Sequence, residues 1–215
     1  MTQSDKWADV PQRLLTAIIG LPIVLAGLFI GSPISTIGII LIALIAMFEL
    51  YHISHINKQW QGLFLMGMVI YIGIPMGLLV VIRDGENGLS YTLLLLITNW
   101  TTDSMALIGG RLFGKHKVAP HISSGKTWEG VIIGFISACI AGWLVGILAR
   151  LSPTIIIIAP PMVACMTILG DLLESRIKRL FHVKDASQLL PGHGGFLDRI
   201  DGLLLAIPIF YLIIN

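Results

Sequence analysis

The sequence predicts an all-α, polytopic membrane protein with about seven transmembrane helices and two long cytoplasmic loops. Of its 215 residues 55% are hydrophobic and only 12% are charged, whereas a soluble domain carries about 25% charged residues. The apolar residues form runs long enough to cross a bilayer core, which takes about 20 residues in helical form. No linker or fixed-period repeat divides the chain, so we expect a single domain over residues 1–215.

Seven apolar runs are the candidate spans. Because backbone polar groups find no partner in lipid, each run is expected to be a helix. The first run is too long for the apolar region of a cleaved signal peptide, so we expect it to be retained. The last run covers only about 25 Å as a helix, so its first turn is expected to lie below the headgroups. The runs are 13–31, 33–51, 62–82, 88–110, 130–149, 153–173 and 199–215.

The placement of Lys and Arg predicts the orientation. Twelve of the 14 Lys and Arg residues lie at the N-terminus or follow the second, fourth and sixth runs, and only Arg83 and Arg150 lie on the other side. Cytoplasmic segments of membrane proteins carry such an excess. The N-terminus and the loops at about 111–129 and 174–198 are therefore expected in the cytoplasm. These loops hold most of the charged and polar residues that could take part in chemistry. We expect no nucleic-acid partner.

Several acidic residues lie within or beside the apolar runs. Glu49 closes the second run, Asp103 lies in the fourth and Asp171 lies near the end of the sixth, while Asp198 and Asp201 begin the seventh. Ionisable groups at that depth are costly and are functional candidates by default. Asp198 and Asp201 are spaced i and i+3, which places them on one helix face.

The segment 175–201 combines three features that suit a bound polyphosphate. Lys178, Arg179 and Lys184 supply positive charge, and the Gly-rich turn 191–195 lets a backbone approach a ligand closely. The aspartate pair that follows is typical of the oxygen ligands that Mg²⁺ takes beside nucleotide phosphates. On the residues alone, a basic cytoplasmic loop with a helix cap remains the alternative.

The same segment resembles the signature of the phosphatidate cytidylyltransferase family, also called CDP-diglyceride synthetases. Every fixed position of that signature is filled, by Ser175, Lys178-Arg179, Lys184-Asp185, Ser187, Leu190-Pro191, His193-Gly194-Gly195, Phe196, Asp198-Arg199 and Asp201. A second block resembles the family's other cytoplasmic region and includes Asp103, Gly109-Gly110-Arg111, Phe113-Gly114-Lys115, Lys126-Thr127 and Glu129-Gly130. This block departs from the family at Ser124, where proline is common. The resemblance covers the chain from about residue 49 to its end.

The resemblance implies a nucleotidyltransferase of phospholipid biosynthesis in the bacterial cytoplasmic (inner) membrane. It implies CTP and phosphatidate as substrates, CDP-diacylglycerol and pyrophosphate as products, Mg²⁺ as cofactor and a homodimer. The expected catalytic residues are Lys178, Arg179, Lys184, Asp185, His193 and Arg199. The expected substrate-binding residues are Ser175, Arg111, Lys126, Thr127, Gly194 and Gly195. The expected metal ligands are Asp198 and Asp201, with Asp171 and Asp103 as further candidates.

Two other functions compete with this interpretation. Another CTP-dependent lipid transferase, such as a polyprenol kinase, would lack the complete signature of residues 175–201. A small ion-coupled transporter would use the intramembrane residues Asp103 and Asp171, but it would not need the long basic loops.

Overall fold

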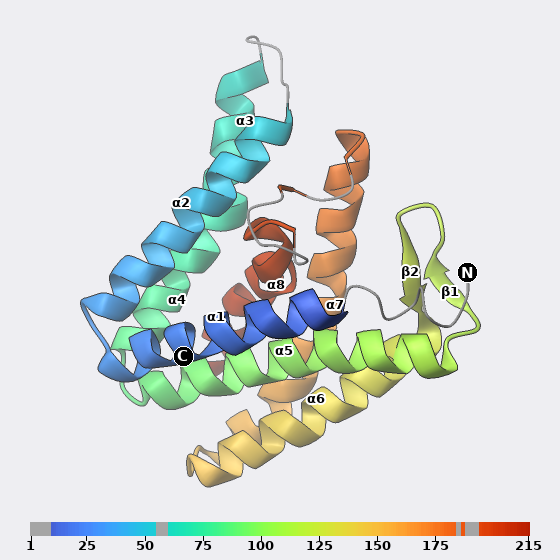
Figure 1. Ribbon diagram of the computed structural model, residues 1–215. Coiled ribbons are helices and arrows are strands. Elements are labelled where there is room, and N and C mark those ends of the chain that lie inside the picture. The colour runs from blue at the N-terminus through green and yellow to red at the C-terminus, as the bar shows by residue number, and fades with distance from the viewer. Residues whose placement is uncertain (1–9, 55–59, 184–185, 188–193) are drawn as a thin grey trace.

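The computed structural model describes residues 10–54, 60–183, 186–187 and 194–215, and helices lie at all the predicted runs (Figure 1). The first three runs form α1 (Val10–Ile30), α2 (Ile34–Ser54) and a rod made of α3 (Gln61–Met68), the π-helical turn η3 (Val69–Gly73) and α4 (Ile74–Asp84). The last four form α5 (Gly88–Phe113), α6 (Trp128–Leu148), α7 (Pro153–Leu180) and α8 (Leu197–Ile214). The predicted all-α class is confirmed.

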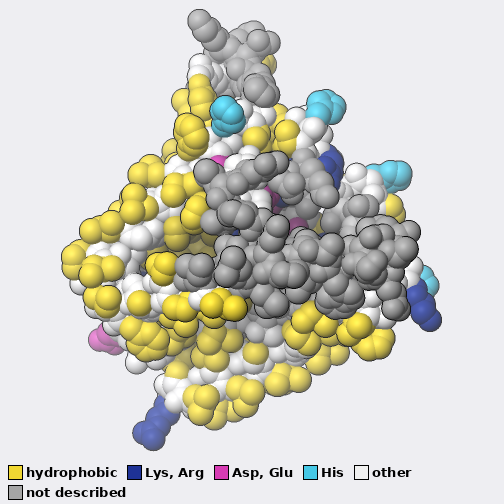
Figure 2. Space-filling model, viewed as in Figure 1, with side chains coloured by type: hydrophobic (Ala, Val, Ile, Leu, Met, Phe, Trp, Pro, Cys, Tyr) yellow, Lys and Arg dark blue, Asp and Glu magenta, His cyan; other side chains and the backbone are white. Residues whose placement is uncertain are grey.

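The surface is that of a membrane protein. Within the described part of the chain, four helical rods are long and apolar enough to cross a bilayer, namely Ile34–Ser54, Gln61–Asp84, Trp128–Leu148 and Pro153–Leu180. Large side chains such as Leu148 and Leu212 are 82% and 71% exposed. Figure 2 shows hydrophobic side chains over much of the visible surface, which a soluble monomer does not display. The number of seven spans stays a prediction.

Two segments predicted as loops contain regular structure instead. Helix α7 continues beyond residue 173 to Leu180, because Glu174 and Lys178 form an i, i+4 ion pair on the helix that favours its continuation. The loop between α5 and α6 contains a hairpin of β1 (Lys117–Ala119) and β2 (Ser123–Thr127), which pair antiparallel. The prediction of a loop was therefore wrong for residues 174–180 and incomplete for residues 111–129.

Helix α8 lies at the centre of the bundle. It contacts α2, α4, α5 and α7, and Figure 1 shows it surrounded by these helices. Leu204, Ile207 and Phe210 are completely buried along it. The first turn of α8 is therefore held by neighbours on several sides, and this turn carries Asp198 and Asp201.

Helices α5 and α6 pack closely through small residues of α6. A Cβ built on Gly134 would lie 2.6 Å from the carbonyl oxygen of Thr102, and one on Gly130 would lie 2.9 Å from the amide nitrogen of Gly110. Such contacts between small residues let helix backbones approach in a membrane. This packing holds the hairpin, which joins the two helices, at the same end of the bundle as the C-terminal part of α7.

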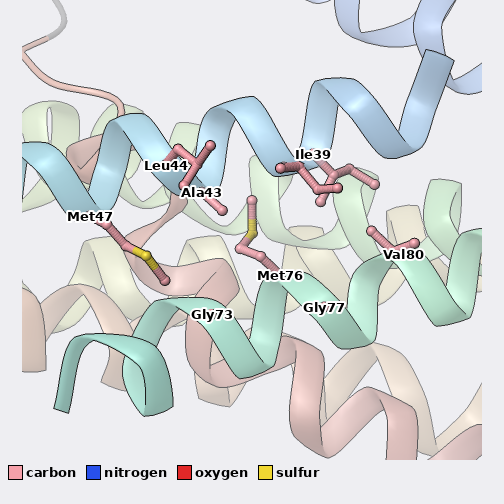
Figure 3. A pocket seen from close by; sticks show the side chains of 9 residues that line it. Ile39, Ala43, Leu44, Met47, Gly73, Met76, Gly77 and Val80 are labelled. Carbon is pink, nitrogen blue, oxygen red and sulfur yellow. The ribbon is translucent and has the colours of Figure 1, made fainter. Parts of the chain in front are cut away.

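A shallow apolar groove of about 150 Å³ lies between α2 and the α3–α4 rod (Figure 3). The π-helical turn η3 precedes Pro75. Proline cannot donate the usual helical hydrogen bond and its ring crowds the preceding turn, so the helix widens there. The groove is lined by Ile39, Ile40, Ala43, Leu44, Met47, Gly73, Met76, Gly77 and Val80. No charged side chain lines it, so it is separate from the polar site described next.

Candidate active site

Helices α7 and α8 cross closely at a pair of glycines. A Cβ built on Gly170 would lie 2.6 Å from the carbonyl oxygen of Asp201, and one built on Gly202 would lie 2.9 Å from that of Thr167. Only hydrogen atoms at these two positions allow the backbones to approach so closely. The crossing therefore brings the Asp201 side of α8 against the polar face of α7.

Four carboxylates from three helices lie around this crossing. They belong to Asp103 on α5, Asp171 and Glu174 on α7, and Asp201 on α8. Glu174 is completely buried and Asp201 is 9% exposed. Asp103 interacts electrostatically with Asp171 and Asp201, and Glu174 does so with Asp201. Like charges in a poorly solvated site repel one another strongly, so this group of carboxylates requires cations.

Two lysines supply positive charge next to these carboxylates. Lys126 Nζ on β2 lies 2.5 Å from Asp171 Oδ2. Lys178 Nζ on α7 lies 3.1 Å from Glu174 Oε1 and 2.5 Å from Asp198 Oδ1. The sequence predicted that both lysines contact the substrate. In the structure they are paired with acidic side chains. Residues from both signature blocks thus meet at one place.

The turn before α8 is organised by Asp198. Its Oδ2 accepts hydrogen bonds from the Gly195 amide at 2.7 Å and the Ala186 amide at 3.1 Å. Gly194 has a φ of +79°, which favours glycine, and a Cβ there would lie 2.5 Å from Asp198 Oδ2. These two glycines, predicted to bind substrate, have a structural role in letting the chain fold around Asp198.

A second carboxylate, from Glu49 on α2, reaches the same turn. Glu49 is 2% exposed, and its Oε1 accepts hydrogen bonds from Ser187 Oγ at 2.6 Å and the Phe196 amide at 3.1 Å. Its Oε2 accepts a hydrogen bond from the Leu197 amide at 2.8 Å. The turn is therefore held by Glu49 on one side and by Asp198 on the other.

The other predicted site residues are placed as follows. Ser175 Oγ donates to Asp171 Oδ1 at 3.3 Å. Arg179 donates from Nε to the Ile122 carbonyl at 3.2 Å, which joins the end of α7 to the hairpin. Arg199 is an exposed residue that interacts electrostatically with Asp103, and Arg111 lies in the last turn of α5. The predicted catalytic residues Lys184, Asp185 and His193 lie outside the described residues.

Two residues of the second block stabilise local structure. Thr127 is the N-cap of α6, and its Oγ1 accepts a hydrogen bond from the Gly130 amide at 3.2 Å. Glu129 accepts hydrogen bonds from the Lys115 amide at 3.1 Å and from His116, whose Nδ1 lies 2.6 Å from Glu129 Oε1. These contacts fix the start of α6 and the entry to the hairpin that carries Lys126.

The cap predicts a specific result for Thr127. Replacing it with alanine removes the acceptor for the Gly130 amide and is expected to lower stability by about 1 kcal/mol. Thr127→Ser retains the hydroxyl and is expected to unfold at the same temperature as the parent. Thermal unfolding of the purified protein in detergent measures both. Equal unfolding temperatures for the alanine and serine variants would contradict the capping role.

The sequence marked Glu49 only as a general functional candidate and gave no role to Glu174, although both were detectable in principle. Glu49 is a carboxylate at the end of an apolar run. Glu174 was assigned to a loop, although Asp171, Glu174 and Lys178 have the i, i+3 and i+7 spacing of one helix face. Glu174 is completely buried, and Lys178 Nζ lies 3.1 Å from its Oε1.

The site offers oxygen donors of the kind that the expected Mg²⁺ ion takes. Carboxylate oxygens are the ligands that Mg²⁺ prefers, and Glu174 brings a completely buried carboxylate to the site. Within the described ranges, however, no three His, Cys, Asp or Glu side chains are already arranged to hold a metal. The donor types fit Mg²⁺, while Lys126 and Lys178 neutralise the acidic side chains in this structure.

The fold and site define a polytopic membrane protein with a buried polar site where two helices cross. A family model described as cytidylyltransferase family matches residues 54–215. The chain belongs to this family. It is 44% identical over 134 residues to a phosphatidate cytidylyltransferase of Haemophilus influenzae, which covers 60% of this chain and 46% of that protein.

Two further relatives carry the same name. The protein from Staphylococcus saprophyticus is 37% identical over 153 residues, covering 70% of this chain and 58% of that protein. The protein from Rickettsia felis is 32% identical over 215 residues, covering 94% of this chain and 90% of that protein. The match thus spans about half the length of the first two relatives and nearly all of the third.

Proposed function

We propose that the chain is a CTP:phosphatidate cytidylyltransferase that makes CDP-diacylglycerol and pyrophosphate. One observation carries the proposal. The two sequence blocks that resemble this family meet at the α7–α8 crossing, where Lys126 of the first block pairs with Asp171, and Lys178 of the second pairs with Asp198. A site with both charges suits a reaction between two polyanions, one of which stays in the membrane.

The reaction needs positioning and charge neutralisation more than a general base. A phosphate oxygen of phosphatidate attacks the α-phosphorus of CTP, and an oxygen–phosphorus bond forms. The bond from the α-phosphorus to the bridging oxygen of the β-phosphate breaks, and pyrophosphate leaves with the electron pair. The attacking phosphate is already ionised near neutral pH. Phosphoryl-transfer enzymes accelerate such steps mainly by electrostatic stabilisation of the transferred group.

The residues of this chain have distinct parts in the proposal. The exposed residues Arg179 and Arg199 would hold the triphosphate together with Lys178. Lys126 and Arg111, from the other block, would hold the lipid phosphate. Because Lys126 and Lys178 are already paired with carboxylates, an incoming phosphate would exchange one anionic partner for another.

We propose Mg²⁺ as the cofactor because the available donors are carboxylate oxygens. Asp201 and Asp171, on the two crossing helices, would hold it, with Asp103 and Asp198 at the sides. The bound ion would neutralise negative charge on the nucleotide phosphates. Asp198 already accepts hydrogen bonds from Lys178 and two backbone amides. Its main role in this proposal is therefore to order the turn before α8.

The proposed location is the cytoplasmic face of a bacterial inner membrane. The contact between Arg179 and the Ile122 carbonyl places the hairpin and the end of α7 on one side. Arg83 and Arg150 lie at the opposite helix ends, in the last turn of α4 and just after α6. An excess of positive charge at the hairpin side supports a cytoplasmic site. A homodimer is proposed on the family resemblance alone.

The purified protein tests the proposal directly. With phosphatidate, CTP and Mg²⁺ in mixed micelles, we expect pyrophosphate release that depends on all three components, together with labelled CDP-diacylglycerol from labelled CTP. Transfer to a polyprenol in place of phosphatidate, with release of CDP, would support the polyprenol kinase instead. Ion flux in proteoliposomes without CTP would support the transporter. Family membership favours the first outcome.

A further inference from the structure

Glu49 is a carboxylate from an apolar helix whose described hydrogen bonds all come from far along the chain. It lies on α2, before the region matched by the family model, which begins at residue 54. Its partners are Ser187 and the backbone amides of Phe196 and Leu197. A buried charge is costly unless it is fully hydrogen-bonded, and here three donors satisfy it. The Glu49 carboxylate is therefore held at the start of α8 by specific hydrogen bonds.

We propose that Glu49 is a positioning residue that fixes the first turn of α8 and thereby the aspartates of that turn. Leu197 is the first residue of α8, and the first amides of a helix have no partner within the helix. Glu49 accepts two of the hydrogen bonds available at this end. A negative charge is also favourable at a helix N-terminus, where the helix dipole is positive.

The local packing leaves room for this contact because residue 195 is glycine. A Cβ on Gly195 would lie 2.6 Å from Glu49 Oε2 and 2.7 Å from Oε1. Only glycine at that position admits the carboxylate. The adjacent Asp198 fastens the same turn from the other side, through the Gly195 amide and through Lys178 on α7. The turn is thus clamped between α2 and α7.

The consequence for activity rests on the proposed function. Asp201 follows Asp198 by one turn, so loss of the clamp on α2 lets the first turn of α8 move relative to α7. Small misplacements of reacting groups reduce turnover by up to about 100-fold. The Glu49 carboxylate is occupied by Ser187 and the amides of Phe196 and Leu197, so its loss is expected to lower kcat more than it raises KM.

The principal variant is Glu49→Gln, which keeps the shape but replaces one accepting oxygen with an NH₂ group facing other donors. We expect kcat to fall by about 10- to 100-fold and KM for CTP to change by less than about threefold. The matched control is Glu86→Gln, at an exposed glutamate between α4 and α5, and it is expected to keep the parent kcat. An unchanged kcat in Glu49→Gln, or a loss confined to KM, would overturn the proposal.

Hydrogen exchange gives a readout that does not depend on activity. In Glu49→Gln the peptide containing residues 195–198 is expected to exchange at least about tenfold faster than in the parent, whereas peptides from α6 keep their protection. If the parent shows no cytidylyl transfer, the proposed function fails while this measurement still tests the clamp. Unchanged exchange at residues 195–198 would overturn the clamp itself.

A milder variant covers the case in which Glu49→Gln fails to insert into the membrane. Ser187→Ala removes one of the three described donors to Glu49 and leaves both backbone amides in place. It is expected to raise exchange at residues 195–198 by about two- to twelvefold, because a single hydrogen bond contributes about 0.5–1.5 kcal/mol. No increase in that variant would likewise contradict the role given to Glu49.

Discussion

Asp201→Asn is expected to insert and fold normally and to lose CTP-dependent formation of CDP-diacylglycerol, by a factor on the order of 10²–10³. The amide keeps the shape of the carboxylate but removes its charge. Asp201 is 9% exposed and lies beside Asp171 and Glu174. Removing one of several mutually repelling charges is therefore expected to leave the unfolding temperature the same or slightly higher. Activity and stability should move in opposite directions, as is common at active sites.

The control for this prediction is an aspartate far from the site. Asp84 ends α4, is exposed and accepts a single hydrogen bond from Thr36 Oγ1 at 3.3 Å. Asp84→Asn is expected to retain full activity. The measurements are pyrophosphate release at several Mg²⁺ concentrations and thermal unfolding in detergent. Full activity of Asp201→Asn would remove the proposal that Asp201 holds the metal.

Gly170→Ala is expected to have a large structural effect, because it adds a methyl group where α7 and α8 cross at the site. The new Cβ would lie 2.6 Å from the Asp201 carbonyl oxygen and 2.9 Å from Gly202 Cα. Both are backbone atoms, so the contact is relieved only if α7 and α8 separate. Overpacking of this kind costs about 1–3 kcal/mol. We expect a lower unfolding temperature and at least a tenfold loss of turnover, because Asp171 and Glu174 move away from Asp201.

The matched control is a glycine-to-alanine change at a helix position that does not lie at the α7–α8 crossing. Gly77 lies within α4, and a Cβ there would have no described atom within 4 Å. Alanine is favoured over glycine inside a helix by about 1 kcal/mol, so Gly77→Ala is expected to be at least as stable as the parent and fully active. If Gly170→Ala behaved like Gly77→Ala, the close crossing would not be what assembles the site.

Much of the fold was predictable because it depends on local patterns. Apolar runs of sufficient length require helices in a bilayer, and helices lie at all seven predicted runs. The prediction failed where charged residues continued a helix, since α7 extends to Leu180 through Glu174 and Lys178. The high content of charged residues in 174–180 predicts a loop. The i, i+4 ion pair between Glu174 and Lys178 instead favours a helix.

The candidate site was predictable in its residue types but not in its pairings. The signature identified Lys178 and Asp198 as site residues, and the second block identified Lys126. They did not reveal that the two lysines pair with Asp171 and Asp198, because those pairings join segments that are far apart in the chain. Thr127 shows the same difference, since a conspicuous residue of the second block caps a helix instead.

The sequence by itself determined a membrane-embedded helical protein, the family resemblance and the chemical types of the site residues, because hydropathy, charge placement and spacing are properties of contiguous segments. The tertiary structure decided which carboxylate lies beside which cation and brought Glu49 to the start of α8. Those contacts depend on how closely α7 and α8 approach at Gly170 and Gly202. Such an approach arises only when several helices pack together.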